Sequence, residues 1–71
     1  MATKLIIVSE SGDLFCVDTE AGTINKLPSD PSFVEAQEKK VGSDSIASVD
    51  AATASGIGCA GAVAAVIMVK L

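Results

Sequence analysis

The stretch 52–71, ATASGIGCAGAVAAVIMVKL, decides how this chain is interpreted, because it is apolar enough to cross a membrane. Residues 51–69 carry no charge over 19 positions. As a helix they would be ~28 Å long, close to the ~30 Å hydrocarbon core of a bilayer. The stretch contains no proline, and Ser43 or Asp44 can cap a helix. The sequence therefore predicts one helix from about Ser45 to Lys70.

Small residues recur in this stretch at the four-residue spacing of a single helix face. Such residues let helix backbones approach closely where water is excluded. The candidate helix-packing residues are Ala52, Gly56, Ala60 and Ala64 on one line, and Ala54, Gly58 and Ala62 on a second. The pattern predicts close packing between helices, either within a membrane or along a filament.

The N-terminal part, residues 1–28, has the pattern of three short strands. Runs rich in β-forming residues cover Lys4–Ser9, Asp13–Asp18 and Thr23–Leu27. The segments between them, ESG and TEAG, both end in a glycine, which can adopt a positive φ in a turn. This arrangement predicts a three-stranded antiparallel meander.

The first two strands are continuously apolar rather than alternating, over residues 5–8 and 14–17. Because side chains alternate between the faces of a strand, both faces of the predicted sheet are apolar. The C-terminal helix, copies of the same chain or a larger partner must cover them.

Residues 29–43 form a polar linker in which Asp30 can cap a short helix through Glu38 or Lys40, with Pro31 in its first turn. The expected fold class is α+β. It comprises the small meander over 1–28, this linker, and a long hydrophobic helix over 44–71 that is transmembrane or packed in a filament.

Charge and composition argue against catalysis and nucleic-acid binding. Five Lys and Arg residues face nine acidic residues, for a net charge of −4, whereas phosphate binding needs clustered cations. Histidine is absent, and no nucleophile, metal cluster or phosphate loop can be assembled from the remaining residues. The sequence predicts a protein that is not an enzyme and has no cofactor, metal or small-molecule substrate. Nucleic acid is expected to bind at most weakly, through Lys70 in a coat-like filament.

The two cysteines, Cys16 and Cys59, form no CxxC motif. We expect two buried, reduced thiols that act as small apolar side chains. A bond between them, which would tie the two halves of the chain together, is the open alternative. The apolar run near the N-terminus, residues 5–8, is too short for a secretory signal peptide.

Two resemblances follow from these patterns. The layout of residues 44–71, an uncharged helix after an acidic region and before Lys70, resembles the major coat proteins of filamentous bacteriophages and, more loosely, the pilins of conjugative pili. It implies a subunit that sits in a membrane and then overlaps with its copies around DNA. The single terminal cation and the N-terminal meander depart from that pattern. Residues 4–28 resemble one blade repeat of a quinoprotein-type β-propeller without its Trp, which implies the meander alone.

Three functions are compatible with these features. The first is a structural subunit of a filament, coat, virion or membrane assembly, which self-associates through the C-terminal helix and is membrane-associated as a single-pass protein. The second is an accessory single-span subunit of a larger membrane complex. The third is the precursor of a ribosomally made, modified peptide, with a leader through about Ala52, a core such as GIGCAGAVAAVIMVKL, and modifiable positions at Thr53, Ser55 and Cys59.

Overall fold

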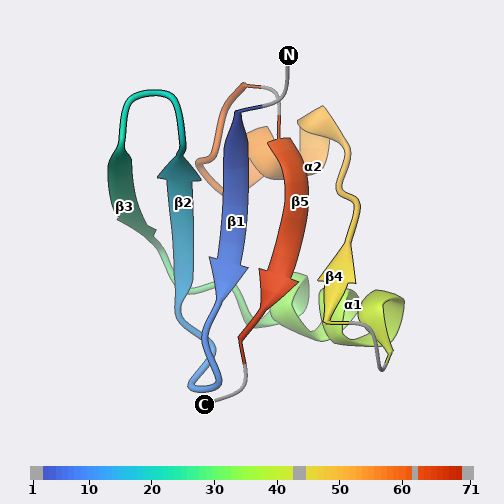
Figure 1. The fold of residues 1–71 in the computed structure, drawn as a ribbon. Helices are drawn as coiled ribbons and strands as arrows, with labels where there is room; N and C mark the ends of the chain where they lie inside the picture. The colour runs from blue at the N-terminus through green and yellow to red at the C-terminus, as the bar shows by residue number, and fades with distance from the viewer. Residues whose placement is uncertain (1–2, 43–44, 62, 70–71) are drawn as a thin grey trace.

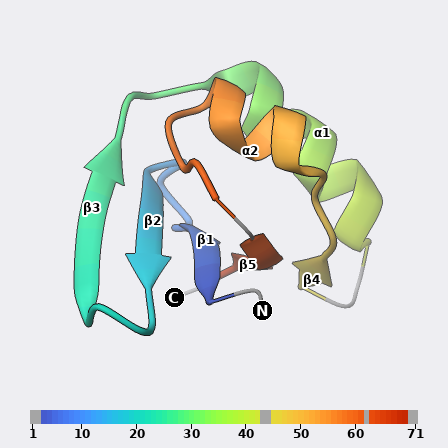
Figure 2. The same cartoon turned by 90° about the horizontal axis from the view of Figure 1, so that it is seen from above.

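The protein was analysed as a computed structural model that describes residues 3–42, 45–61 and 63–69. Five strands form one mixed sheet in the order β3-β2-β1-β5-β4, as Figure 1 shows. The elements in chain order are β1 (Lys4–Val8), β2 (Leu14–Asp18), β3 (Thr23–Leu27), α1 (Pro31–Val41), β4 (Ile46–Ala47), α2 (Ala51–Gly56) and β5 (Val63–Met68). Both helices lie against the same face of the sheet (Figure 2).

The first three strands pair antiparallel as a meander, at the positions where the sequence predicts them. Ile6 on β1 pairs with Cys16 on β2, which in turn pairs with Asn25 on β3. The β1–β2 turn is closed by a bond from the Gly12 N–H to the Ser9 carbonyl. The meander is not a separate unit, because β5 from the other end of the chain completes the same sheet.

The prediction of a long C-terminal helix over residues 44–71 is wrong. Helix α2 ends at Gly56, and the chain then turns through Gly58 and Gly61, whose φ angles are 103° and 114°. These angles are incompatible with a right-handed helix, and glycine adopts them at no steric cost. The following residues, Val63–Met68, form a strand instead. The α+β fold with a long hydrophobic helix is therefore replaced by a mixed five-stranded sheet with two short helices.

The expected membrane span fails for the same reason. Within residues 3–42, 45–61 and 63–69, no helix has the length and apolar content that crossing a bilayer requires. The description of the chain as a single-pass transmembrane protein, and its localisation through a C-terminal helix, are therefore not supported.

The apolar character of this segment comes instead from the position of β5 inside the sheet. Strand β5 lies between β1, to which it is parallel, and β4, to which it is antiparallel. Val66 and Met68 on one face of β5 are buried in the core, and Ala65 and Ile67 on the other face are apolar as well, so both faces contribute to the uncharged run. The uncharged run that resembles a membrane span therefore contains an interior strand.

Helix α1 begins as the sequence predicts. Asp30 is its N-cap and accepts a hydrogen bond of 3.1 Å from the Phe33 N–H, and Pro31 occupies the first turn. The helix turns Phe33, Gln37 and Val41 toward the sheet, where all three are buried. Asp50, rather than Ser43 or Asp44, caps the C-terminal helix α2. Ser43, Asp44 and Lys70 lie outside the described residues.

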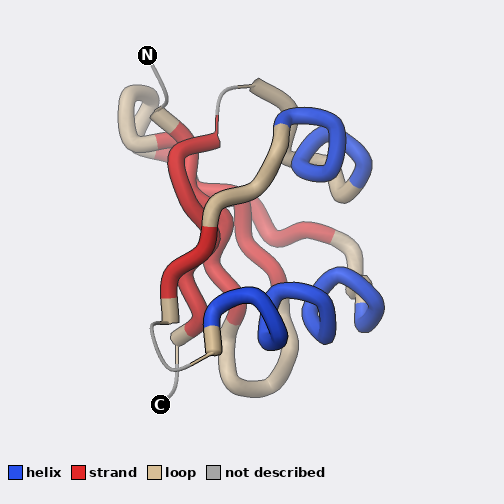
Figure 3. Tube along the Cα trace, turned by 90° about the vertical axis from the view of Figure 1, so that its right-hand side faces the viewer, coloured by secondary structure: helices blue, strands red, loops and turns tan. Residues whose placement is uncertain are grey.

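The core lies between the sheet and the two helices, and Figure 3 shows these two layers from the side. Alternate residues of the strands point into it and are buried: Ile6, Val8, Leu14, Cys16, Leu27, Val66 and Met68. The helical layer contributes Phe33, Val41 and Ala54, and Cys59 joins from the segment after α2. The helices therefore cover one face of the sheet, and no second layer covers its opposite face within the part of the chain that the structure describes.

Candidate functional site

The candidate site is the face of the sheet that the helices do not cover, here called the outer face. Its residues are those that alternate with the core residues along the strands: Leu5, Ile7, Phe15, Val17, Ile24, Ile46, Ala65 and Ile67. None of them is buried, although seven are large and apolar. Ile24 is 69 % exposed and Ile46 is 58 % exposed.

The ladder registers place these side chains in two rows across the sheet. In one row, Ile24, Val17, Leu5 and Ala65 follow each other on β3, β2, β1 and β5. In the other row, Phe15, Ile7, Ile67 and Ile46 follow each other on β2, β1, β5 and β4. Directly paired side chains on one face of a sheet contact each other, so the rows form a continuous apolar surface.

Lys26 on β3 pairs with Phe15 and extends the second row by one charged residue. Its ammonium lies 3.9 Å from a carboxylate oxygen of Asp13, and both side chains are about half exposed or more. A pair this exposed contributes little to stability, but it marks the polar border of the surface. Within the described residues, the interior of the outer face carries no charge.

The size of the outer face can be estimated from standard strand dimensions. Four strands about 4.8 Å apart and about 17 Å long, with the two-residue β4 beside them, span roughly 350 Å². The largest apolar patch on a typical monomeric protein is about 300–600 Å², and such patches often serve as interaction sites. The outer face is therefore large relative to a chain whose whole accessible surface is 4286 Å².

The two cysteines are joined, so the expectation of two reduced thiols is wrong. Cys16 on β2 and Cys59 after α2 form a disulfide across 43 residues of sequence, with Cα atoms 5.5 Å apart. Closing a loop of this length stabilises a fold by ~4 kcal/mol in the chain-entropy account. For a chain of this size that contribution is comparable to the whole net stability of a small domain.

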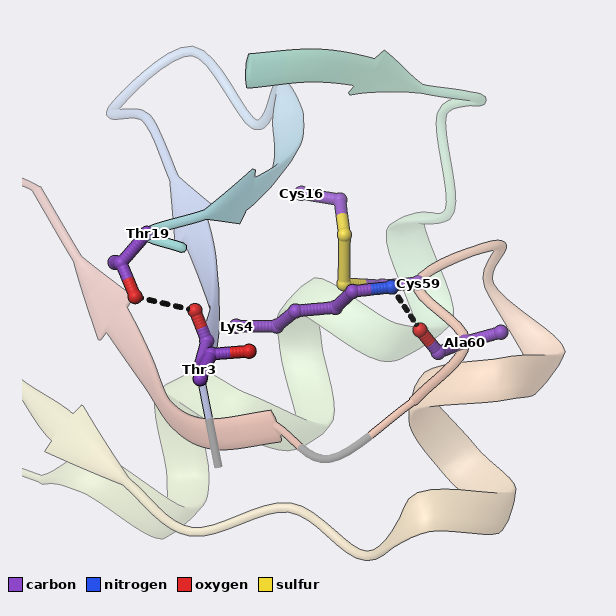
Figure 4. Close-up of a disulfide and its surroundings, with 6 residues drawn as sticks. All are labelled: Thr3, Lys4, Cys16, Thr19, Cys59 and Ala60. Carbon is purple, nitrogen blue, oxygen red and sulfur yellow. Dashed lines mark hydrogen bonds between the residues drawn. A yellow bond between two sulfur atoms is a disulfide. The ribbon is translucent and has the colours of Figure 1, made fainter. Parts of the chain in front are cut away.

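Lys4 lies close to this disulfide, as Figure 4 shows. Its ammonium donates a hydrogen bond to the carbonyl oxygen of Ala60, the residue that follows Cys59. A Cβ built on Gly61 would lie 3.2 Å from the same ammonium nitrogen, so the absence of a side chain at Gly61 leaves room for Lys4. Nearby, the Thr19 hydroxyl donates a bond of 2.6 Å to the Thr3 carbonyl and ties the β2 end to the start of β1.

The small residues proposed for helix packing do not share one helix. Ala52, Ala54 and Gly56 lie in α2, and only Ala54 of these is buried. Gly58 and Ala60 lie in the connection from α2 to β5, Ala64 lies in β5, and Ala62 lies outside the described residues.

Two polar features lie away from the outer face. A hollow of about 330 Å³ lies at the carboxyl ends of β1 and β5, where Ser9, Glu10, Glu38 and Met68 line it. Hydrogen bonds from the Thr53 side chain and backbone lower the pKa of the exposed Asp50 carboxyl, which is a helix cap. Across the described ranges, His, Cys, Asp and Glu form no group of three or more that could hold a metal ion.

The sequence indicates only half of the outer face. The unbroken apolar runs at 5–8 and 14–17 imply a sheet with two apolar faces, and the structure bears this out for β1 and β2. The sequence analysis does not place Ile46, Ala65 and Ile67 on this face, because their positions depend on the pairing of β5 with β1 and β4, which are distant from it in the sequence.

Comparison with protein families, with curated proteins and with solved structures gives no match for this chain.

Proposed function

We propose that this protein is a non-enzymatic structural subunit that self-associates through the outer face of its sheet. The observation that carries the proposal is the outer face: two rows of apolar side chains with no covering layer in the described fold. The proposal keeps the expected class of function, an assembling subunit, and replaces the helix by the sheet as the surface that assembles.

A second copy of the chain is the occupant that this surface fits best. The chain has a net charge of −4, so the charged surfaces of two copies repel each other. This repulsion is weakest where two uncharged surfaces meet. Within the described residues the interior of the outer face is uncharged, so a two-fold related copy needs no complementary charge to match it. Two sheets packed in this way would form a sandwich with the two helical layers on the outside.

The area of the face sets the expected strength. Two copies would bury about 700 Å² together, below the ~1,200–2,000 Å² of standard specific interfaces and in the range of weak, transient contacts. Association must also offset the loss of rotational and translational freedom. We therefore expect a reversible dimer with a dissociation constant in the micromolar range, rather than a permanent one.

Sedimentation velocity of the oxidised chain between about 1 and 500 µM tests the proposal. Wild type should shift from monomer to dimer over this range. The double variant Ile24→Lys, Ile46→Lys alters the two most exposed outer-face residues, so the fold should tolerate it, and it should remain monomeric because each dimer would bury four charges.

The matched control is Ser32→Lys, Ala36→Lys, which adds the same charge at exposed positions of α1, away from the outer face. It should dimerise like wild type. A wild-type chain that stays monomeric throughout, or equal dimerisation of all three proteins, would refute the proposal.

The peptide-precursor hypothesis stays untested. The segment that such processing would release contains β5, so its release would remove an interior strand from the sheet. The accessory-subunit alternative loses its membrane span and keeps only the general idea of a larger protein partner.

A further inference from the structure

The Cys16–Cys59 disulfide joins two parts of the chain that meet only in the folded state. Cys16 lies in the middle of β2, and its side chain points into the core. Its partners in the strand ladders are Ile6 on β1 and Asn25 on β3. Cys59 lies in the connection that leads from α2 into β5. The bond therefore fixes the entry of β5 to the meander.

Part of the outer face depends on the position of β5. Ala65 and Ile67 belong to β5, and Ile46 belongs to β4, the edge strand that pairs with β5 in the described sheet. If β5 leaves β1, these three residues leave the outer face together, and the β1 edge is exposed. The self-association surface is complete only while β5 is docked.

We propose that Cys16–Cys59 is a thiol–disulfide exchange site whose oxidation state switches self-association on and off. The inference rests on the proposed function. The reductant is a dithiol, either a small molecule or a protein. One of its thiolates attacks a sulfur of the pair, which forms a mixed disulfide and releases the other cysteine as a thiolate. The second thiol of the reductant then resolves the mixed disulfide. In sum, two electrons and two protons pass to Cys16 and Cys59, and the reductant becomes a disulfide.

Both cysteines are buried, with Cys16 8 % exposed and Cys59 1 % exposed, so a reductant reaches the pair only after local opening. The Lys4 ammonium donates a hydrogen bond to the carbonyl oxygen of Ala60, the residue after Cys59 (Figure 4). Its positive charge attracts an incoming thiolate and stabilises a departing one.

The connection around Cys59 can open without disrupting the sheet. The backbone N–H groups of Ile57, Gly58 and Cys59 all bond back to carbonyls of Ala54 and Ser55 in α2, and none of these bonds belongs to a strand ladder. Local opening of such a turn costs less than global unfolding and gives a reductant access to the pair.

The first experiment compares self-association of the wild-type chain in its two redox states by sedimentation velocity. Reduction with dithiothreitol should weaken dimerisation at least about tenfold, and reoxidation should restore it. Amide hydrogen exchange should show that residues 63–69 lose protection on reduction. Equal dimerisation in both states, or full protection of these residues after reduction, overturns the switch while the proposed function stands. An oxidised chain that never dimerises refutes the proposed function instead.

The second experiment tests the exchange site without depending on dimerisation. The rate of reduction by dithiothreitol should rise with its concentration, and Lys4→Met should slow it by about threefold or more. Lys26→Met is the matched control, because Lys26 lies on β3 and pairs with Asp13; it should react like wild type. Equal rates for all three chains, or a rate independent of dithiothreitol and equal to global unfolding, overturn the assignment.

Discussion

Ile6 on β1 and Val66 on β5 are partners in a parallel ladder, and neither side chain is exposed to solvent. Parallel neighbours cannot be joined by a tight turn and need a long crossover. Here the crossover contains β2, β3, α1, β4 and α2, that is, most of the chain. The Ile6–Val66 pair therefore joins strands from the two ends of the chain, and it forms only when the intervening elements have folded.

The importance of this pair leads to a first prediction. Val66→Ala should lower the free energy of unfolding by about 2 kcal/mol, because it leaves a cavity in the core next to Ile6. Ile24→Ala, at a position that is 69 % exposed, should change it far less. Chemical denaturation of both variants, at a concentration where the chain is monomeric, makes the comparison. Similar losses would mean that β5 is not packed into the core as described.

A second prediction concerns the turn that ends the expected helix. Gly58→Ala and Gly61→Ala should each destabilise the fold by about 1–3 kcal/mol, since alanine is strained at a φ of 103° or 114°. Gly56→Ala is the control, because Gly56 lies in α2 and a Cβ there meets no atom within 4 Å. It should be neutral or slightly stabilising. Thermal unfolding compares the three variants. If a long helix ran through this region, Gly58→Ala and Gly61→Ala would stabilise the protein instead.

Gln37 provides a third prediction. It is 3 % exposed on the sheet-facing side of α1, and its side-chain oxygen accepts no hydrogen bond from the part of the chain that the structure describes. Gln37→Leu should raise the free energy of unfolding by about 1 kcal/mol or more, because it removes an unsatisfied buried acceptor. Gln37→Glu should lower it, because it buries a charge. A destabilised leucine variant, measured by urea denaturation, would show that the amide has a partner.

A fourth prediction concerns pH. The Asp50 pKa is lowered from its usual value of 3.8, chiefly by hydrogen bonds from the Thr53 side chain and then from the Thr53 backbone. The stabilising effect of this cap is therefore complete above the unfolded-state pKa and is lost as the pH falls through the lower folded-state pKa. An NMR titration of the Asp50 carboxyl should give a value below 3.8, and Thr53→Ala should move it back toward 3.8. A wild-type value at or above 3.8 would contradict the capping geometry.

The sequence by itself determined the local elements of this protein. Runs of β-forming residues and glycine turns placed the three strands of the meander, and Asp30 followed by Pro31 placed the start of α1, because these signals act within a few residues. The unbroken apolar runs of β1 and β2 also indicated that the sheet has two apolar faces.

Only the tertiary structure decided the nature of the C-terminal segment. An uncharged run of small and β-branched residues is compatible both with a membrane helix and with an interior strand whose two faces are apolar. The difference lies in its neighbours: β1 offers backbone partners to Val63–Met68, and the disulfide holds the preceding turn against β2. Those neighbours come from the other end of the chain, so no local pattern within residues 51–69 encodes them.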